Sequence, residues 1–263
     1  MQANMRQSSI CLYATHFSGN SLPTYIRSML LEMTKHCQRL VLISESKNWS
    51  SASAHFIEVN NIEILFSPNK GYDFGKWYWA LKKIKFNQSK RIILLNDSML
   101  LLSSLDNFFK WCNKTSSPVK GFLPSYERSH HLQSYLLVLD TPAIEPTLRY
   151  FKRKRRYRSK RKVIRQYELG LSVYWKKKGY TLEAFHTIQE NYNKNPNYFL
   201  VDELLTLKTP LIKRHILMNT FGNDMKDTLE KQGFNFSKEH YLQLIKQNYS
   251  NKDYKAALEI SKS

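Results

Sequence analysis

The stretch "RIILLNDSML" at residues 91–100 decides the fold, because four consecutive apolar residues lead directly into Asn96, Asp97 and Ser98. An uninterrupted apolar run is typical of a parallel strand that is covered by helices on both faces. A carboxylate that follows such a strand lies at the sheet edge where open α/β proteins bind their ligands. The stretch therefore predicts a buried strand with a polar site at its carboxyl end.

The segments on either side of this strand alternate between strand and helix patterns. Apolar or aromatic runs predict strands at 9–17, at 39–46 and within 57–68, and helical spacing predicts helices at 22–37 and 72–86. This order predicts an α/β fold, a doubly wound and mostly parallel sheet flanked by helices.

The second half of the chain has a similar but less regular pattern. Residues 122–140 read as one strand or a hairpin, and residues 164–185 as a helix that ends at Gly179 before a short strand. The polar, helical pattern after residue 221 reads as an appendage. We therefore expect a main domain at 1–220 and a helical C-terminal extension at 221–263.

The composition is that of a globular protein. Hydrophobic residues make up 42% of the 263 residues and aromatic residues 13%, which excludes a disordered chain. The three cysteines have no C-x-x-C spacing, and no apolar run reaches the ~18 residues of a membrane span. These features predict a cytoplasmic protein with reduced thiols, placed peripherally on the inner membrane where it touches lipid.

The net charge of +20 is concentrated in one segment. Residues 152–165, "KRKRRYRSKRKVIR", hold ten Lys and Arg residues and no acid. Three interpretations are open: a solvated loop, a contact with anionic phospholipid or a lipid-linked diphosphate, and a nucleic-acid contact. Tyr157 is the segment's one aromatic residue, which argues against base stacking.

Asp97 is the first candidate for chemistry. A carboxylate at the end of a strand can hold Mn²⁺ or Mg²⁺, and the ion can bridge the two phosphates of a nucleotide diphosphate. Asn96 and Ser98 would then contact the same ligand. The alternative is that Asp97 or Ser98 closes a turn or caps the next helix.

The loop "PNKGYDFGKWYWAL" at 68–81 is the second candidate. Its glycines, Gly71 among them, allow a close approach of the backbone to a ligand, and the helix that follows offers its N-terminus. Asn69 and Asp73 could hold the ribose or the base of a nucleotide. The alternative is that Asp73 only caps the helix.

Glu168 is the third candidate, near the start of the helix in "YELGLSVYWKKKGYTL" at 167–182. It could act as a general base that removes a proton from an acceptor hydroxyl. The alternative is that it is an acid placed favourably in the first turn of a helix.

Further polar residues are secondary candidates. In a strand the side chains of His130 and His131 point to opposite faces, so that one of them, taken as His131, reaches the acceptor together with Gln133. Asp202 is a candidate acceptor contact, and Lys213 a candidate contact of the diphosphate. A packed helix with a solvated Asp202 is the alternative.

The order of these motifs resembles nucleotide-sugar glycosyltransferases of the GT-A fold, especially the large family 2. Five segments together resemble the rhamnan synthesis protein F family: "NKGYDFGKWYWAL", "LLNDSML", "HHLQSYLLVL", "VIRQYELGLS" and "NPNYFLVDELL…TPLIKR". The resemblance runs from about residue 8 to residue 215. It departs from the usual patterns in having one acid at Asn96-Asp97-Ser98 and Tyr167-Glu168 in place of a Glu-Asp pair.

The resemblance implies a GT-A-like fold and the transfer of a sugar from a nucleotide-sugar donor to a lipid-linked or glycan acceptor of a bacterial surface polysaccharide. It implies Glu168 as base, with inversion at the anomeric carbon, and Asp97 as metal ligand. Two rivals stay open: a non-catalytic basic module that binds membrane or nucleic acid, and a degenerate transferase that binds donor without turnover.

Overall fold

The computed structural model describes residues 8–16, 19–86, 89–154 and 159–216. These residues form two compact units. The first contains the chain up to Ser21, Leu30–Asp97 and Leu105–Asn195, and the second contains Leu22–Met29, Ser98–Ser104 and the chain from Pro196 onward. The predicted boundary at residue 220, the predicted extension 221–263 and residues 155–158 of the basic run lie outside the described residues.

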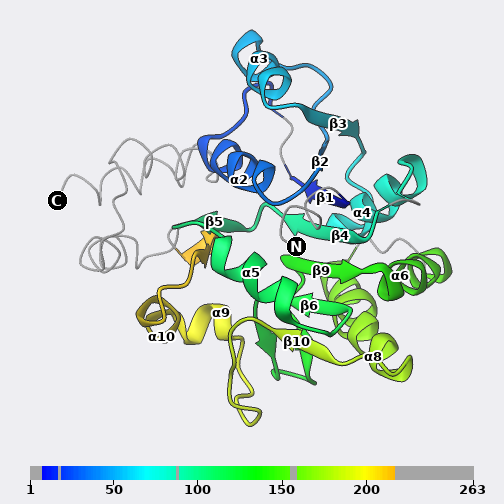
Figure 1. The fold of residues 1–263 in the computed structure, drawn as a ribbon, viewed down its shortest axis with the longest axis vertical. Helices are drawn as coiled ribbons and strands as arrows, with labels where there is room; N and C mark the ends of the chain where they lie inside the picture. Colours follow the sequence, from blue (N-terminus) through cyan, green and yellow to red (C-terminus); the bar gives the residue numbers. More distant parts are fainter. Residues whose placement is uncertain (1–7, 17–18, 87–88, 155–158, 217–263) are drawn as a thin grey trace. The chain divides into compact units, whose positions relative to one another are not determined.

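The first unit is built on a seven-stranded sheet with the order β10-β6-β9-β4-β1-β2-β3 (Figure 1). Its strands are β1 (Ser9–Ala14), β2 (Arg39–Ser44), β3 (Ile62–Phe66), β4 (Arg91–Asn96), β6 (Val119–Gly121), β9 (Leu136–Asp140) and β10 (Leu182–Ala184). Strands β1 to β4 pair in parallel, and β9 is antiparallel to both β4 and β6. The predicted mostly parallel α/β sheet is confirmed.

The sheet is doubly wound, because its connections run in two directions from β1. The chain moves outward through α2 (Thr24–Thr34) and α3 (Ser51–Val59) to β2 and β3, and then returns through α4 (Tyr72–Lys83) to β4 on the other side of β1. Right-handed crossovers place α3 and α4 on opposite faces of the sheet. The point where the strand order reverses lies between β1 and β4, which is where such sheets bind ligands.

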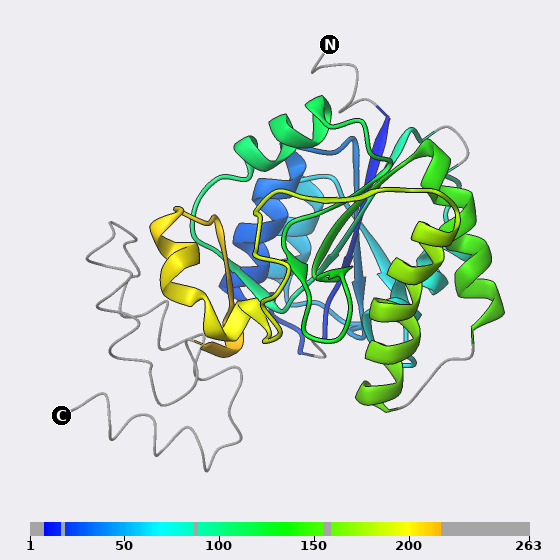
Figure 2. The same cartoon turned by 90° about the horizontal axis from the view of Figure 1, so that it is seen from below.

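Helices cover both faces of this sheet. Figure 2 shows α6 (Thr141–Arg153) and α8 (Gly170–Lys177) on one side of the strands and α5 (Asp106–Lys114) on the other. Helices α4, α6 and α8 form a single layer, because α6 packs against both of the others. The sequence analysis did not predict α3, α5 or α6.

The two covered faces of β4 explain the apolar run at residues 92–95. Ile92 and Leu94 of β4 belong to the core cluster beneath α4, which also contains Phe74 and Trp77, whereas Ile93 and Leu95 are buried outside that cluster. Alternate residues of a strand point to opposite faces, so a strand covered on both faces needs an apolar residue at every position. Each such side chain contributes about 1.5–3 kcal/mol by burial.

The segment 122–140, predicted as one strand or a hairpin, contains the short antiparallel pair β7 (Pro124–Ser125) and β8 (His131–Leu132), followed by β9.

The amino end of β4 and the carboxyl end of β9 are joined by ion pairs. Arg91 Nε donates to Asp140 Oδ1 at 2.7 Å, and Lys120 Nζ donates to Asp140 Oδ2. These contacts compensate the buried charges of Arg91 and Lys120.

All three cysteines are buried as free thiols. Burial raises the pKa of Cys112 to about 12 and holds the pKa of Cys11 well above its ordinary value. Among the described residues, none of the helices is long and apolar enough to cross a lipid bilayer.

The second unit is small. It contains the antiparallel pair β5 (Met99–Leu101) and β11 (Leu211–Lys213), the short helices α9 (Pro196–Phe199) and α10 (Val201–Thr206), and the first half of α2. Within it, the guanidinium of Arg214 lies over the ring of Tyr25, 4.6 Å from its centroid.

Candidate functional site

The polar residues that follow β1, β2 and β4 meet at the carboxyl edge of the sheet. His16 follows β1, Glu45 follows β2 and Asp97 follows β4. The backbone N–H of His16 donates to Asp97 Oδ2 at 2.9 Å, and His16 Nδ1 lies 3.5 Å from Glu45 Oε1. Because the strands are parallel, their ends bring these three residues to the reversal point of the sheet.

Asp73 joins this group from the first turn of α4. Asn96 Nδ2 donates to Asp73 Oδ2 at 2.8 Å, and His16 Nε2 lies 3.0 Å from Asp73 Oδ1. The structure thus brings together Asp73, Asn96 and Asp97, which the sequence placed on two separate motifs. Since both oxygens of Asp73 face protein groups, this carboxylate orients its neighbours as much as it presents itself to a ligand.

His16 lies at the centre of this acidic group, and its side chain is 30% exposed. Burial lowers the pKa of His16, but the hydrogen bond and the negative charge of Asp73, together with the charge of Asp97, outweigh that effect and raise it overall. The imidazole therefore carries a positive charge to a higher pH than an ordinary histidine.

Lys76 lies beneath this group, with a side chain that is 0% exposed. Its ammonium donates to Glu45 Oε1 at 2.7 Å and to the carbonyl oxygen of Thr15. A buried ammonium requires such partners. Lys76 therefore ties α4 to the ends of β1 and β2 and fixes the backbone immediately before His16.

The loop before α4 has an unusual backbone. Gly71 and Tyr72 have φ angles of 85° and 56°, both in the left-handed region, and Tyr72 meets His16 edge to face. A non-glycine residue held in this region is costly and is typical of functional loops. Asn69 lies exposed in this loop, and Gly71 is buried at the N-cap of α4.

Glu168 reaches the same sheet edge from the helical layer. The backbone N–H and the hydroxyl of Ser134 donate to Glu168 Oε1 at 3.2 and 3.3 Å. The carbonyl oxygen of the next residue, Tyr135, accepts a hydrogen bond from the backbone N–H of Asn96 at 3.1 Å. Glu168 is thus connected through two residues to the strand end that carries Asp97.

Aromatic packing holds Glu168 near α4 as well. Tyr167 stacks on Phe74 with ring centroids 5.0 Å apart. The residues that neighbour Glu168 and Asp73 in sequence are therefore in direct contact, which brings the third predicted motif to the second.

His131 and Gln133, the predicted acceptor residues, are both buried, the first at the start of β8 and the second just after it. His131 Nδ1 lies 2.7 Å from the carbonyl oxygen of Ser129, and the backbone N–H of Gln133 donates to Leu123 O. Gln133 directly precedes the Ser134 that binds Glu168. Contact of either residue with an acceptor stays a prediction.

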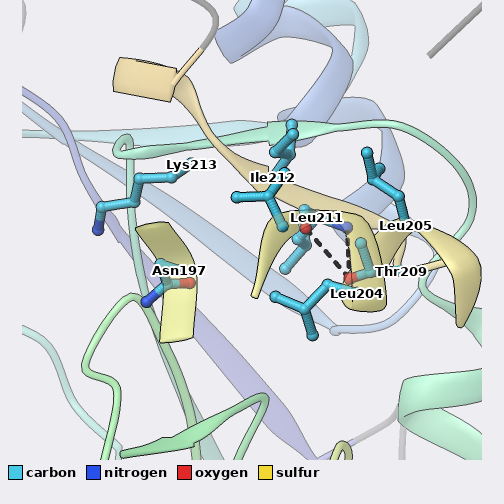
Figure 3. Close-up of a pocket in the computed structure, with 8 residues that line it drawn as sticks. Asn197, Leu204, Leu205, Thr209, Leu211, Ile212 and Lys213 are labelled. Atoms are coloured by element: carbon cyan, nitrogen blue, oxygen red, sulfur yellow. Dashed lines mark hydrogen bonds between the residues drawn. The ribbon is translucent and has the colours of Figure 1, made fainter. Parts of the chain in front are cut away.

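Ser98, Asp202 and Lys213 belong to the second unit. Lys213 Nζ donates to Ser98 Oγ at 3.1 Å, and Asp202 is exposed on α10. A small pocket in this unit is lined mainly by Val201, Leu204, Leu205, Leu211 and Ile212, and Figure 3 shows Lys213 extending away from these apolar side chains. The donor and acceptor roles of these three residues stay predictions.

The chemistry of the sheet edge fits a divalent cation that uses few protein ligands. Asp97 is 3% exposed and one of its oxygens is oriented by the His16 backbone. Mg²⁺ typically takes one or two carboxylates and completes its shell with water and phosphate oxygens. Asp97 is suited to be that carboxylate.

Within the described ranges, a different trio has His, Asp or Glu ligand atoms close enough together to surround an ion: Glu32, His36 and Asp106. Glu32 Oε1 accepts from the backbone N–H of Leu105 at 2.6 Å and lies 3.1 Å from His36 Nε2. Lys35 Nζ binds its other oxygen at 2.8 Å. Glu32 thus serves to cap the start of α5, and His36 O accepts from Ser9 at the amino end of β1.

His16, Glu45 and Lys76 were missed by the sequence analysis. His16 and Glu45 lie inside the predicted strands 9–17 and 39–46, because these predictions extend past the ends of β1 at Ala14 and β2 at Ser44. With those ends in place, the rule that selected Asp97 would also have selected both residues. Lys76 gave no comparable signal, because a lysine in a helix is ordinarily solvated.

The sequence model of the rhamnan synthesis protein F family matches residues 40–261 of this chain. No curated protein sequence matches this chain.

Three solved structures illustrate its similarity to known folds. A cytidylyltransferase from Leptospira borgpetersenii has a TM-score of 0.47 at 13% identity, covering 92% of this chain and 97% of that one. The 4-diphosphocytidyl-2C-methyl-D-erythritol synthase of Anaerococcus prevotii has a TM-score of 0.43 at 10% identity, covering 78% and 100%. The glycosyltransferase GlyE of Streptococcus pneumoniae has a TM-score of 0.42 at 10% identity, covering 97% and 64%.

Proposed function

The chain belongs to the rhamnan synthesis protein F family, and from this premise we propose that it is a nucleotide-sugar-dependent glycosyltransferase of GT-A-like fold. It transfers a sugar from a nucleotide diphosphate donor to a hydroxyl of a growing bacterial surface polysaccharide. The observation that carries the proposal is the meeting of Asp73, Asn96 and Asp97 at the carboxyl edge where the strand order reverses, with Glu168 connected to Asn96 through Ser134 and Tyr135.

The donor lies at the ends of β1 and β4 in this proposal. Asn69 and Gly71 contact the nucleoside, and Asp73, held by Asn96 and His16, fixes the loop that carries them. Asp97 holds Mn²⁺ or Mg²⁺. When bound, the cation supplies positive charge to the departing diphosphate.

Glu168 is the general base. The acceptor oxygen forms a bond to the anomeric carbon, the bond from that carbon to the diphosphate breaks, and the hydroxyl proton moves to the Glu168 carboxylate. Ser134 orients this carboxylate through Oε1. A single displacement of this kind inverts the anomeric configuration.

The acceptor is a glycan or a lipid-linked glycan, and we propose a peripheral contact with anionic membrane through one face of the first unit. On the layer of α4, α6, α7 (Lys160–Val163), α8 and the segment Ile164–Leu169, eleven basic residues besides the buried Lys76 stand against three acidic ones. On α3 and α5 there are two of each. The described parts of the basic run, 152–154 and 159–165, thus belong to a charged face.

The aromatic rings of this face favour lipid over nucleic acid. Lysine ammonium groups lie over the rings of Tyr78, Trp79, Tyr150 and Tyr174, at 5.1 to 5.9 Å from their centroids. A ring with an ammonium over one face has at most its other face left for stacking on a base. Clustered Lys and Arg residues attract anionic headgroups.

Donor binding tests the proposal directly. We would measure the thermal shift of the protein with a panel of nucleotide diphosphates and nucleotide-sugars, with and without Mn²⁺. A ligand at a hundredfold excess over its Kd adds about 2.7 kcal/mol to the free energy of unfolding. We expect a metal-dependent shift with one nucleotide class that is lost in Asp97→Asn.

Asp106→Asn is the matched control, because it makes the same change in the other acidic group. It should leave the shift intact. Loss of the shift in Asp106→Asn with retention in Asp97→Asn would assign the cation to the group of Glu32, His36 and Asp106 instead of to Asp97. No shift with any donor, beside binding to anionic lipid or nucleic acid, would favour a non-catalytic binding module.

A Glu168→Gln variant separates binding from chemistry. We expect it to retain the nucleotide shift and to lose transfer. Formation of a product with retained anomeric configuration by the unaltered protein would contradict the role of Glu168 as base.

A further inference from the structure

The helix that carries Glu168 contains a rare irregularity. Residues Ile164–Leu169 form a π-helical segment between α7 and α8, so that one helix axis changes from α to π and back to α. Such segments are uncommon and are frequent at functional sites. Glu168 lies inside it.

The hydroxyl of Tyr150 binds the backbone of this irregular segment. It belongs to α6 and donates to the carbonyl oxygen of Gln166, which lies within the π segment. The side chain of Gln166 is held too, because Lys154 Nζ donates to Gln166 Oε1 at 3.1 Å. Helix α6 therefore holds Gln166 at its backbone and at its side chain.

Gly170 makes the Tyr150 contact possible. A Cβ atom at this position would lie 2.4 Å from the Tyr150 hydroxyl oxygen and 3.3 Å from the carbonyl oxygen of Arg165. The first distance is far below a normal van der Waals contact. The absence of a side chain at residue 170 is thus what lets the hydroxyl reach the helix backbone.

The π segment decides where its side chains point. Tyr167 is buried against Phe74 and Phe151, while the next residue, Glu168, turns its carboxylate to Ser134. A wider turn changes the direction of every side chain in it relative to the helix that follows. The carboxylate of Glu168 therefore depends on the turn that Tyr150 holds.

We propose that Tyr150 and Gly170 are positioning residues for the base of the transfer reaction. The Tyr150 hydroxyl stabilises the π-helical turn that aims Glu168 at Ser134 and at the acceptor hydroxyl, and Gly170 provides the space for it. This inference rests on the proposed role of Glu168.

The test combines Tyr150→Phe, Gly170→Ala and the double variant. Tyr174→Phe is the matched control, because it also removes a tyrosine hydroxyl. The ring centroid of Tyr174 lies 4.9 Å from that of Tyr150. We expect Tyr150→Phe to lower kcat roughly ten- to hundredfold, as a misplaced group does. The KM for the donor should stay unchanged. The acidic limb of the kcat–pH profile should be displaced. Tyr174→Phe should match the unaltered protein.

The double variant tests the steric part. Gly170→Ala alone should be at least as impaired as Tyr150→Phe. In the Tyr150→Phe background the same change should add little, because the added Cβ would then face the ring carbon at 3.7 Å, an ordinary contact. Equal losses in both backgrounds would overturn the role of Gly170.

Hydrogen exchange gives a readout that needs no substrate. The backbone N–H of Ser134 donates to Glu168, so its exchange should accelerate about tenfold in Tyr150→Phe, the equivalent of one lost hydrogen bond, and remain unchanged in Tyr174→Phe. Unchanged exchange and an unchanged pH profile, with reduced stability alone, would make Tyr150 merely structural. If Glu168→Gln is inactive while Tyr150→Phe is normal, this inference fails and the proposed function stands. If Glu168→Gln is fully active, the assigned base fails first.

Discussion

At the scale of single residues, the ion pair of Lys76 and Glu45 is unequal. The Lys76 side chain is fully buried, whereas that of Glu45 is 22% exposed. A buried charge that loses its partner costs about 3–5 kcal/mol. We expect Glu45→Gln to lower the free energy of unfolding by that amount and Lys76→Met by less, because the carboxylate left behind can reach water.

Urea unfolding of the two variants measures this difference. Since Lys76 also binds the Thr15 carbonyl ahead of His16, Glu45→Gln should weaken nucleotide binding in parallel. Equal costs for both variants would show that the lysine finds another partner.

His186 is the residue that should govern acid stability. Burial lowers its pKa, its Nε2 atom has no hydrogen-bond partner among the described residues, and its ring packs against Phe122 and Phe185. The unfolded chain therefore binds a proton more readily than the folded one, and stability falls as the pH drops below the ordinary histidine value of about 6.5.

We expect His186→Phe to flatten this dependence. The variant should equal or exceed the unaltered protein in stability at pH 8, and its advantage should grow as the pH falls through 6 to 5. Thermal unfolding across this range is the measurement. Parallel curves for the two proteins would assign the acid sensitivity to other groups.

The site residues show how far local sequence patterns reach. Asp97 could be predicted, because a strong apolar strand pattern placed it at a sheet edge. Glu168 could be predicted only through its motif, since its contact with Ser134 joins segments 34 positions apart. Lys76 could not be predicted, because the burial of a lysine depends on the strands that happen to lie above it.

At the scale of elements, the start of α4 depends on Gly75 more than on the glycine before it. A Cβ at Gly75 would lie 1.9 Å from the carbonyl oxygen of Lys70. In an ordinary helix interior, Gly→Ala stabilises by about 1 kcal/mol. Here we expect Gly75→Ala to destabilise by about 2 kcal/mol or more, as overpacking does.

The same substitution should displace the loop that carries Asn69 and weaken nucleotide binding. Urea unfolding and the nucleotide-induced thermal shift measure the two effects. Lys82→Ala, at an exposed position of the same helix, is the control for helix propensity. A gain in stability in Gly75→Ala would mean that the loop before α4 can move away without cost.

The helices predicted at 22–37 and 72–86 are α2 and α4, and most of the predicted strands are present as well. The runs at 9–17 and 39–46 contain β1 and β2, and of the two segments considered within 57–68 the second is β3 while the first falls in α3. The π-helical segment could not be predicted, because the hydroxyl that binds it is on α6 and the space for that contact comes from a missing side chain at residue 170. Neither is visible in the periodicity of residues 164–177.

At the scale of the whole molecule, the uneven charge of the first unit is expected to decide what it binds. We expect sedimentation with vesicles that contain anionic phospholipid, no sedimentation with neutral vesicles, and release by high salt. Each basic residue near an anionic membrane contributes about 1 kcal/mol. Reversing two charges on α6, with Lys152→Glu and Arg153→Glu, should therefore abolish most of the binding.

The matched control reverses two lysines on the opposite face, with Lys110→Glu and Lys114→Glu on α5. It changes the net charge by the same amount and should leave vesicle binding intact. Equal losses in both variants would mean that net charge alone drives the interaction. Binding to duplex DNA without binding to vesicles would favour the nucleic-acid partner.

The parallel half of the sheet could be predicted, whereas the antiparallel insertion of β9 could not. Alternating strands and helices before residue 96 permit few topologies. After β4 the chain places β9 between β4 and β6, and the ion pairs of Asp140 with Arg91 and Lys120 stabilise that position. The antiparallel direction of β9 also brings Ser134, which precedes it, beside the carboxyl end of β4.

The burial of all three cysteines makes the protein suitable for labelling at a single added cysteine. Cys11, Cys37 and Cys112 are each at most 4% exposed, so a reagent in solution cannot reach their sulfur atoms in the folded protein. A thiol reagent should therefore label the unfolded protein three times and the native protein not at all. A cysteine introduced at the exposed Lys70, beside Asn69, would then be the single point of attachment for a fluorophore, and its emission would report the arrival of a nucleotide in real time.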